Sequence, residues 1–183
     1  MNESQFARMR VRFSALVTLG IWGLLAWRHF HGGVPVHHVL HRGDLPGISC
    51  WWDGILIPAL TWFLVGRARR RLVVDGETPG SPRASRQVLL GWAGALGFGL
   101  ALAWGTLHDA PAAASAPAIL LLLGLCFPIY RAECVLGFVL GMTPAVGSVL
   151  PLTFATLMAG VGAVMYLGLR PVLIRAGRWV LGA

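Results

Sequence analysis

The sequence has 183 residues, of which 56% are hydrophobic and 12% are charged, and its formal net charge is +8. A typical soluble domain has about 25% charged residues, so this chain has too few polar side chains to cover a surface in water. The composition therefore excludes a soluble nucleotide-binding domain, a secreted disulfide scaffold and a disordered tail. It predicts an integral membrane protein in contact with the lipid bilayer.

All 15 basic residues are arginine, and most of them lie in short clusters beside apolar segments. Charges that orient membrane helices are placed in this way, whereas a nucleic-acid interface combines basic residues with polar side chains that read the bases. We therefore expect no nucleic-acid partner. The absence of lysine suggests a GC-rich bacterial genome, and with it a multi-pass protein of the bacterial inner (cytoplasmic) membrane.

Apolar runs divide the chain into membrane spans. A helix needs roughly 17–25 mostly apolar residues to cross a bilayer, and arginine clusters and Pro/Gly-rich turns separate such runs here. The predicted fold is all-α: a single transmembrane domain over residues 1–183, with six transmembrane helices and both termini cytoplasmic. The approximate spans are residues 13–27, 49–66, 87–107, 117–130, 133–150 and 152–169.

The C-terminal half also allows a five-span interpretation, in which residues 116–142 form one long helix. Cytoplasmic loops are enriched in arginine, so the distribution of arginines separates the two interpretations. Six spans leave Arg28 and Arg42 outside and the other 13 arginines inside. Five spans move three more arginines outside and bury Arg131 in lipid, at a cost of at least roughly 2.5–3.5 kcal/mol. The sequence therefore favours six spans.

Prolines interrupt the predicted spans, notably Pro58 and Pro144. Each frees the backbone carbonyl four residues earlier, that of Gly54 or Leu140, and in hydrocarbon such a carbonyl needs another partner. The run 141–148 contains the strongest break, and discontinuous helices of this kind form substrate sites in many transporters. A plain helix kink is the alternative interpretation.

Two acids, Asp53 and Glu133, begin predicted spans. Each could simply complement the dipole of its helix, or it could face a cavity as a functional acid. Arg131 lies two residues before Glu133 and does not share its helix face, so an ion pair between them would need the turn between spans. The candidates for a solute pathway are Asp53, Glu133, Thr143, Pro144 and Ser148.

Five of the six histidines lie between positions 29 and 41. The pattern allows a short interfacial helix over residues 34–41, on which His37 and His41 would be one turn apart. The candidate metal ligands are His37, His38, His41 and Asp44, a set that suits a transition metal or haem. Two other interpretations stay open: a loop whose imidazoles bind headgroups, water or backbone, and a pH-responsive element.

Small residues recur at four-residue spacing, as at Ala95 and Gly99 and at Gly137 and Gly141. This spacing lets helix backbones approach closely, either within the chain or between copies in a homo-oligomer. A cluster of arginines follows the second span; it is first an orientation signal, and the same charges would contact anionic lipid headgroups. The cluster consists of Arg67, Arg69, Arg70 and Arg71.

These patterns lead to three functional hypotheses. The first is a small transporter or channel subunit for a small solute or ion, with its polar site near the broken fifth span. The second is a metal- or haem-dependent membrane enzyme with a histidine-rich site at the periplasmic face. The third is a non-catalytic assembly subunit. Whether the chain is an enzyme is left open by its residues.

Overall fold

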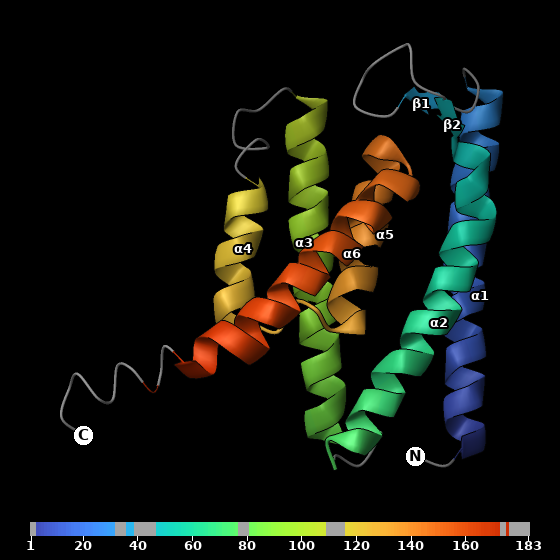
Figure 1. Ribbon diagram of the computed structural model, residues 1–183. Helices are drawn as coiled ribbons and strands as arrows, with labels where there is room; N and C mark the ends of the chain where they lie inside the picture. The colour runs from blue at the N-terminus through green and yellow to red at the C-terminus, as the bar shows by residue number, and fades with distance from the viewer. Residues whose placement is uncertain are drawn as a thin grey trace.

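The computed structural model describes residues 3–31, 36–38, 47–76, 81–108, 116–172 and 175. These residues form six α-helices that alternate in direction along the chain (Figure 1). The helices are α1 (Glu3–Phe30), α2 (Asp53–Val74), α3 (Pro82–Leu107), α4 (Ala116–Cys126), α5 (Ala132–Val146) and α6 (Val149–Val164). A 3-10 turn, Cys50–Trp52, precedes α2, and a π-helical turn, Met165–Leu169, follows α6.

Three of the described helices are long and apolar enough to cross a membrane: Ser4–Phe30, Pro82–Leu107 and Val149–Val172. The chain is therefore a helical membrane protein. Helices α4 and α5 have 11 and 15 residues, which gives lengths of about 16 and 22 Å at 1.5 Å per residue. Both are shorter than the roughly 30 Å hydrocarbon core of a bilayer.

The segment that the five-span interpretation fuses into one helix contains two helices instead. Helix α4 ends at Cys126, two residues before Pro128, whose ring cannot continue a helix. Tight turns follow, with hydrogen bonds from Ile129 N to Phe127 O at 2.8 Å and from Arg131 N to Pro128 O at 3.2 Å. Helix α5 then starts in the opposite direction, which makes Glu133 a residue of its first turn.

The histidine-rich segment differs from the predicted interfacial helix. Strand β1 (Val36–His38) pairs antiparallel with β2 (Gly47–Ser49), with Val36 opposite Ser49. The helical interpretation of this part is wrong, because pairing with β2 satisfies backbone groups that a single helical turn would leave open. The strands lie beside the end of α1 and the start of α2 in Figure 1.

Helix α5 occupies the centre of the bundle, in contact with α2, α3 and α6. Most of its residues are buried, and Val139 has no exposed surface. The Phe138 ring lies 6.2 Å from the Phe98 ring of α3 and 5.9 Å from the Phe154 ring of α6, centroid to centroid. The core is thus built around α5 rather than around the longer helices.

Glycines let the backbones of α3 and α5 touch. A Cβ added at Gly99 would lie 2.7 Å from the carbonyl oxygen of Phe138, and one added at Gly141 would lie 2.6 Å from that of Leu96. Both distances are too short for a real Cβ, so glycine is required at each position. These small residues therefore pack within the chain, whereas association between copies stays a prediction.

Replacing Gly99 with alanine should destabilise the protein, because the new methyl group meets rigid backbone of α5. Overpacking of this kind costs about 1–3 kcal/mol. The matched control is Gly97→Ala on the same helix, where an added Cβ meets no described atom within 4 Å; it should be neutral or stabilise by about 0.5–1 kcal/mol. The measurement is the free energy of unfolding in detergent, and equal effects of both substitutions would contradict the packing argument.

Candidate functional site

The predicted pathway residues gather at the two ends of the interface between α2 and α5. These helices run in opposite directions, so the start of each lies near the end of the other (Figure 1). Asp53 begins α2 beside Ser148, which follows α5. Glu133 lies in the first turn of α5 beside Arg71, in the last turn of α2. The structure therefore separates the candidates into two polar contacts.

The first contact joins the carboxylate of Asp53 to Ser148. Oδ1 of Asp53 accepts hydrogen bonds from the backbone N–H of Ser148 at 2.9 Å and from its hydroxyl at 2.5 Å. Asp53 is 3% exposed and Ser148 is fully buried. Hydrogen bonds to a charged group are stronger than those between neutral groups, so this contact holds the start of α2 against the α5–α6 connection.

Gly147 makes this geometry possible. Its φ of 74° lies in the left-handed region, which costs glycine nothing and most other residues a great deal. The N–H of Gly147 bonds to the carbonyl of Thr143 at 3.0 Å and closes the last turn of α5. The chain then turns at Gly147, and the N–H of Ser148 reaches Asp53 instead of continuing the helix. The break predicted over residues 141–148 is thus a helix end with a defined acceptor.

Two further groups complete this end of the bundle. A guanidinium nitrogen of Arg28, near the end of α1, donates to the carbonyl of Pro144. The hydroxyl of Thr143 donates to the carbonyl of Val139 at 2.6 Å, within α5 itself. Arg28 therefore ties α1 to the end of α5, whereas the Thr143 hydroxyl is already bonded to its own helix.

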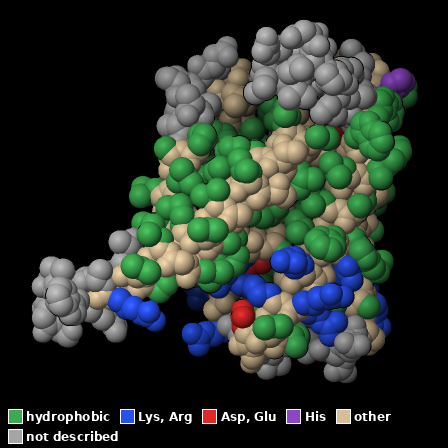
Figure 2. All heavy atoms as spheres, in the orientation of Figure 1, with side chains coloured by type: hydrophobic (Ala, Val, Ile, Leu, Met, Phe, Trp, Pro, Cys, Tyr) green, Lys and Arg blue, Asp and Glu red, His purple; other side chains and the backbone are tan. Residues whose placement is uncertain are grey.

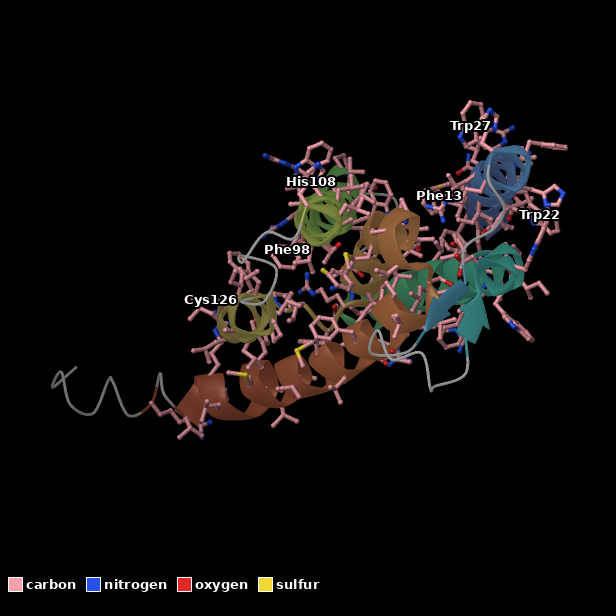
Figure 3. All side chains as sticks on the ribbon, turned by 90° about the horizontal axis from the view of Figure 1, so that it is seen from above. Phe13, Trp22, Trp27, Phe98, His108 and Cys126 are labelled. Atoms are coloured by element: carbon pink, nitrogen blue, oxygen red, sulfur yellow. The ribbon has the colours of Figure 1, made fainter. Side chains whose placement is uncertain are left out.

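Pro58 leaves the carbonyl of Gly54 without its hydrogen bond within α2, and this carbonyl has found another donor. The indole N–H of Trp22 on α1 donates to the carbonyl of Gly54 at 3.2 Å. Seen from above, Trp22 and Trp27 lie on the side of α1 that faces away from α5 (Figure 3). The hydrogen bond to the carbonyl that Pro58 frees thus links α1 to α2, and no cavity is needed at that carbonyl.

The second contact is an ion pair across the α2–α5 interface. A guanidinium nitrogen of Arg71 lies 2.9 Å from Oε1 of Glu133, with side chains 20% and 3% exposed. Among the described residues, neither carboxylate oxygen of Glu133 accepts an aligned hydrogen bond. The contact is therefore an attraction between charges without directional hydrogen bonds. The partner of Glu133 comes from α2 and not from Arg131, the nearest arginine in the sequence.

The interface between the two contacts is mostly apolar and buried. Ile57 of α2 and Val139 of α5 have no exposed surface, and Leu64 and Met142 are each 7% exposed. Thr61 is also fully buried, and its hydroxyl has no hydrogen-bond partner among the described residues. From Asp53 to Arg71 the helix rises about 27 Å at 1.5 Å per residue, so the two contacts lie almost a hydrocarbon thickness apart.

The predicted metal ligands are only partly visible. His37 and His38 belong to β1, while His41 and Asp44 lie outside the described residues. His31, at the end of α1, stacks on the ring of Trp27 with centroids 3.8 Å apart. The part of the chain that the structure describes contains no group of three potential metal ligands. A metal or haem site in this segment therefore stays a prediction.

Sequence reasoning gave Arg28 a role only in orientation, and it gave Arg71 orientation and contact with anionic lipid, yet both side chains contact the ends of α5. One signal was available for Arg71. A buried carboxylate such as Glu133 needs a cation, and the arginine cluster after the second span falls on the same side of the predicted topology. No sequence spacing connects residues 71 and 133, because their proximity depends on how α2 and α5 pack.

Comparison of the chain with protein-family models, with curated proteins and with solved structures gives no match. Fold alone does not define function, so the geometry of this site is the basis for the proposed function.

Removing the carboxylate of Asp53 should destabilise the protein. Asp53→Ala leaves the N–H and hydroxyl of Ser148 without their acceptor, at a cost of about 1.5–3 kcal/mol for hydrogen bonds to a charged group. Asp75→Ala is the control, because Asp75 is exposed at the far end of the same helix. A double-mutant cycle with Ser148→Ala should show a coupling energy of about 1 kcal/mol; additive effects would contradict a direct bond.

Removing Arg71 should cost more than removing its neighbour. Arg71→Gln leaves the buried carboxylate of Glu133 uncompensated, a change that typically costs about 3–5 kcal/mol. Arg70→Gln removes the same charge from an exposed position and should change unfolding free energy by about 0.5 kcal/mol or less. Adding Glu133→Gln to Arg71→Gln should restore most of the lost stability; no recovery would show that the ion pair is not the cause.

Proposed function

We propose that this chain is a small transporter or channel subunit for a small solute or ion. In this proposal it lies in the bacterial inner membrane with six spans and both termini cytoplasmic. The observation that carries the proposal is the pair of buried carboxylates, Asp53 and Glu133, at opposite ends of one helix interface. Ionisable groups inside a membrane protein are costly, and they commonly mark ion or proton pathways.

The length of α5 supports this function. At about 22 Å it is shorter than the hydrocarbon is thick, so its two ends, which carry Glu133 and the Gly147–Ser148 break, lie within the depth of the membrane in this proposal. Irregular backbone within a membrane protein is tolerated where it is buried in protein or lines a watery cavity. Transporters use such discontinuous helices to place polar groups near a substrate. A short central helix surrounded by α2, α3 and α6 fits that use.

The distribution of charge supports the proposed orientation. The arginines in view gather at one end of the bundle, near the start of α1 and the end of α2 (Figure 2). Arg28 belongs to the opposite end, where it bonds to Pro144. Since cytoplasmic segments are enriched in arginine, the arginine-rich end is the cytoplasmic one in this proposal.

The two contacts act as gates at opposite ends of the interface. With both closed, Ile57 and Val139 seal the middle, and the described conformation is occluded. Protonation of Asp53 removes the charge that holds Ser148, and protonation of Glu133 removes its attraction to Arg71. Hydrogen bonds to a charged group contribute about 1.5–3 kcal/mol, and an uncompensated buried charge costs about 3–5 kcal/mol, a scale at which binding of a proton or solute shifts a conformational equilibrium. Opening one gate at a time would expose the interface to one side of the membrane.

The proposal predicts proton-linked transport by the purified protein. Proteoliposomes loaded with the pH-sensitive dye pyranine are placed under a potassium diffusion potential set by valinomycin, and internal pH is followed with and without candidate solutes. The wild-type protein should acidify the vesicles. Asp53→Asn and Glu133→Gln should each lower the rate to that of protein-free vesicles, because neither amide can exchange a proton.

Asp75→Asn is the matched control, since it neutralises an exposed carboxylate just after α2 and outside both gates; it should transport at the wild-type rate. Wild-type vesicles that acidify no faster than protein-free vesicles, with every solute in the panel, would contradict the proposal. Full activity in both gate variants would contradict this assignment of the pathway.

A further inference from the structure

An apolar groove opens at the arginine-rich end of the bundle, beside Glu133 and far from the Asp53–Ser148 contact. Its volume is about 310 Å³, and side chains from four helices form its wall. Phe6 and Phe13 come from α1, Leu64 from α2, Leu89 from α3 and Leu136 from α5. Almost all of the wall is hydrocarbon, so the groove suits a chain of methylene groups and offers little to a polar solute.

A shallow basic depression adjoins the groove. Arg8 and Arg12 are one helical turn apart on α1, and with Leu16 they line an open hollow on the face of that one helix, beside the groove. Met9 and Phe13 line both the hollow and the groove, so the two share a wall. Arg8 and Arg12 are exposed, and two guanidinium groups at this spacing form a seat for a phosphate group.

Together the groove and the hollow match one class of molecule. We propose that they bind an anionic phospholipid, with its phosphate between Arg8 and Arg12 and one acyl chain in the groove between α1 and α3. A free phosphate would satisfy the arginines and leave the groove unfilled, whereas a zwitterionic lipid would fill the groove with a weaker headgroup contact. Glu133 also borders the groove, but lipid binding here rests on the hydrocarbon wall and the two arginines and does not require transport.

The position of the site agrees with the depths at which a lipid places its phosphate group and its acyl chains. The groove is formed by the first turns of α1, α3 and α5 and by the last turns of α2, where the arginine clusters lie. Arginines at this level meet phosphates at the membrane surface, and the apolar residues one or two turns further along meet acyl chains. Exposed hydrophobic residues at the groove and the hollow, such as Met9 and Leu16, extend the surface that faces acyl chains.

The test measures lipid affinity of the purified protein in detergent by native mass spectrometry. The probes are dioleoyl phosphatidylglycerol, dioleoyl phosphatidylcholine and inorganic phosphate at equal concentration. Phosphatidylglycerol should bind with one high-affinity site. The double variant Arg8→Gln/Arg12→Gln should bind it about 25-fold more weakly, since each basic residue near an anionic surface contributes about fivefold. Leu89→Trp, at an exposed position of the groove wall, should also weaken binding by narrowing the groove.

The matched control is Arg83→Gln/Arg86→Gln, which removes two exposed arginines at the start of α3 that do not line the groove or the hollow. It should keep wild-type affinity for phosphatidylglycerol. Equal losses in both double variants would show a diffuse charge effect and overturn the site. Equal binding of phosphatidylcholine would overturn the role of the arginines, and full competition by inorganic phosphate would show an anion site without a lipid chain.

Discussion

The backbone contact between α3 and α5 is the constraint on which the rest of the bundle depends. Gly99 and Gly141 allow the two helices to approach until carbonyl and Cα atoms touch. In a membrane no hydrophobic force drives helices together, so close packing and polar contacts supply the association energy. Once α3 holds α5 in the centre, α2 and α6 have a short, rigid helix to pack against, and both ends of α5 fall inside the protein.

A short helix inside a membrane protein leaves polar backbone at both ends, and the side chains of neighbouring helices satisfy part of it here. Arg28 from α1 caps the Pro144 carbonyl, and Asp53 from α2 accepts the N–H of Ser148. At the other end, Arg71 neutralises Glu133. The start of α2 thus meets the end of α5, and the start of α5 meets the end of α2. This reciprocal arrangement is confined to α2 and α5. Helix α3 packs closely along α5, but among the described residues α6 makes no comparably extensive contact with α2.

The arginines serve more than one purpose in this chain. Arg71 pairs with a buried carboxylate, and the Arg10 guanidinium lies 3.9 Å from the centre of the Trp62 ring while Nε donates to the Trp62 carbonyl at 3.0 Å. Arg69 lies over the ring of Phe6, 4.5 Å from its centre. These contacts join α1, α2 and α5 at the charged end of the bundle. The guanidinium group suits such roles because it is planar, weakly hydrated and always charged.

The sequence by itself determined the helical membrane class, and its preference for six helices over five agrees with the six α-helices of the described residues, because hydrophobic runs, prolines and arginine clusters act locally along the chain. It also placed Asp53 and Glu133 at the start of predicted spans and Ser148 in the broken stretch of the fifth span. Tertiary structure alone decided that Asp53 bonds to Ser148 and Glu133 to Arg71, since those partners are far apart in the chain and meet through helix packing. Tertiary structure also replaced the expected helix at Val36–His38 with a strand, because this segment pairs with residues 47–49. The local sequence around Val36–His38 does not indicate that a pairing strand follows about ten residues later.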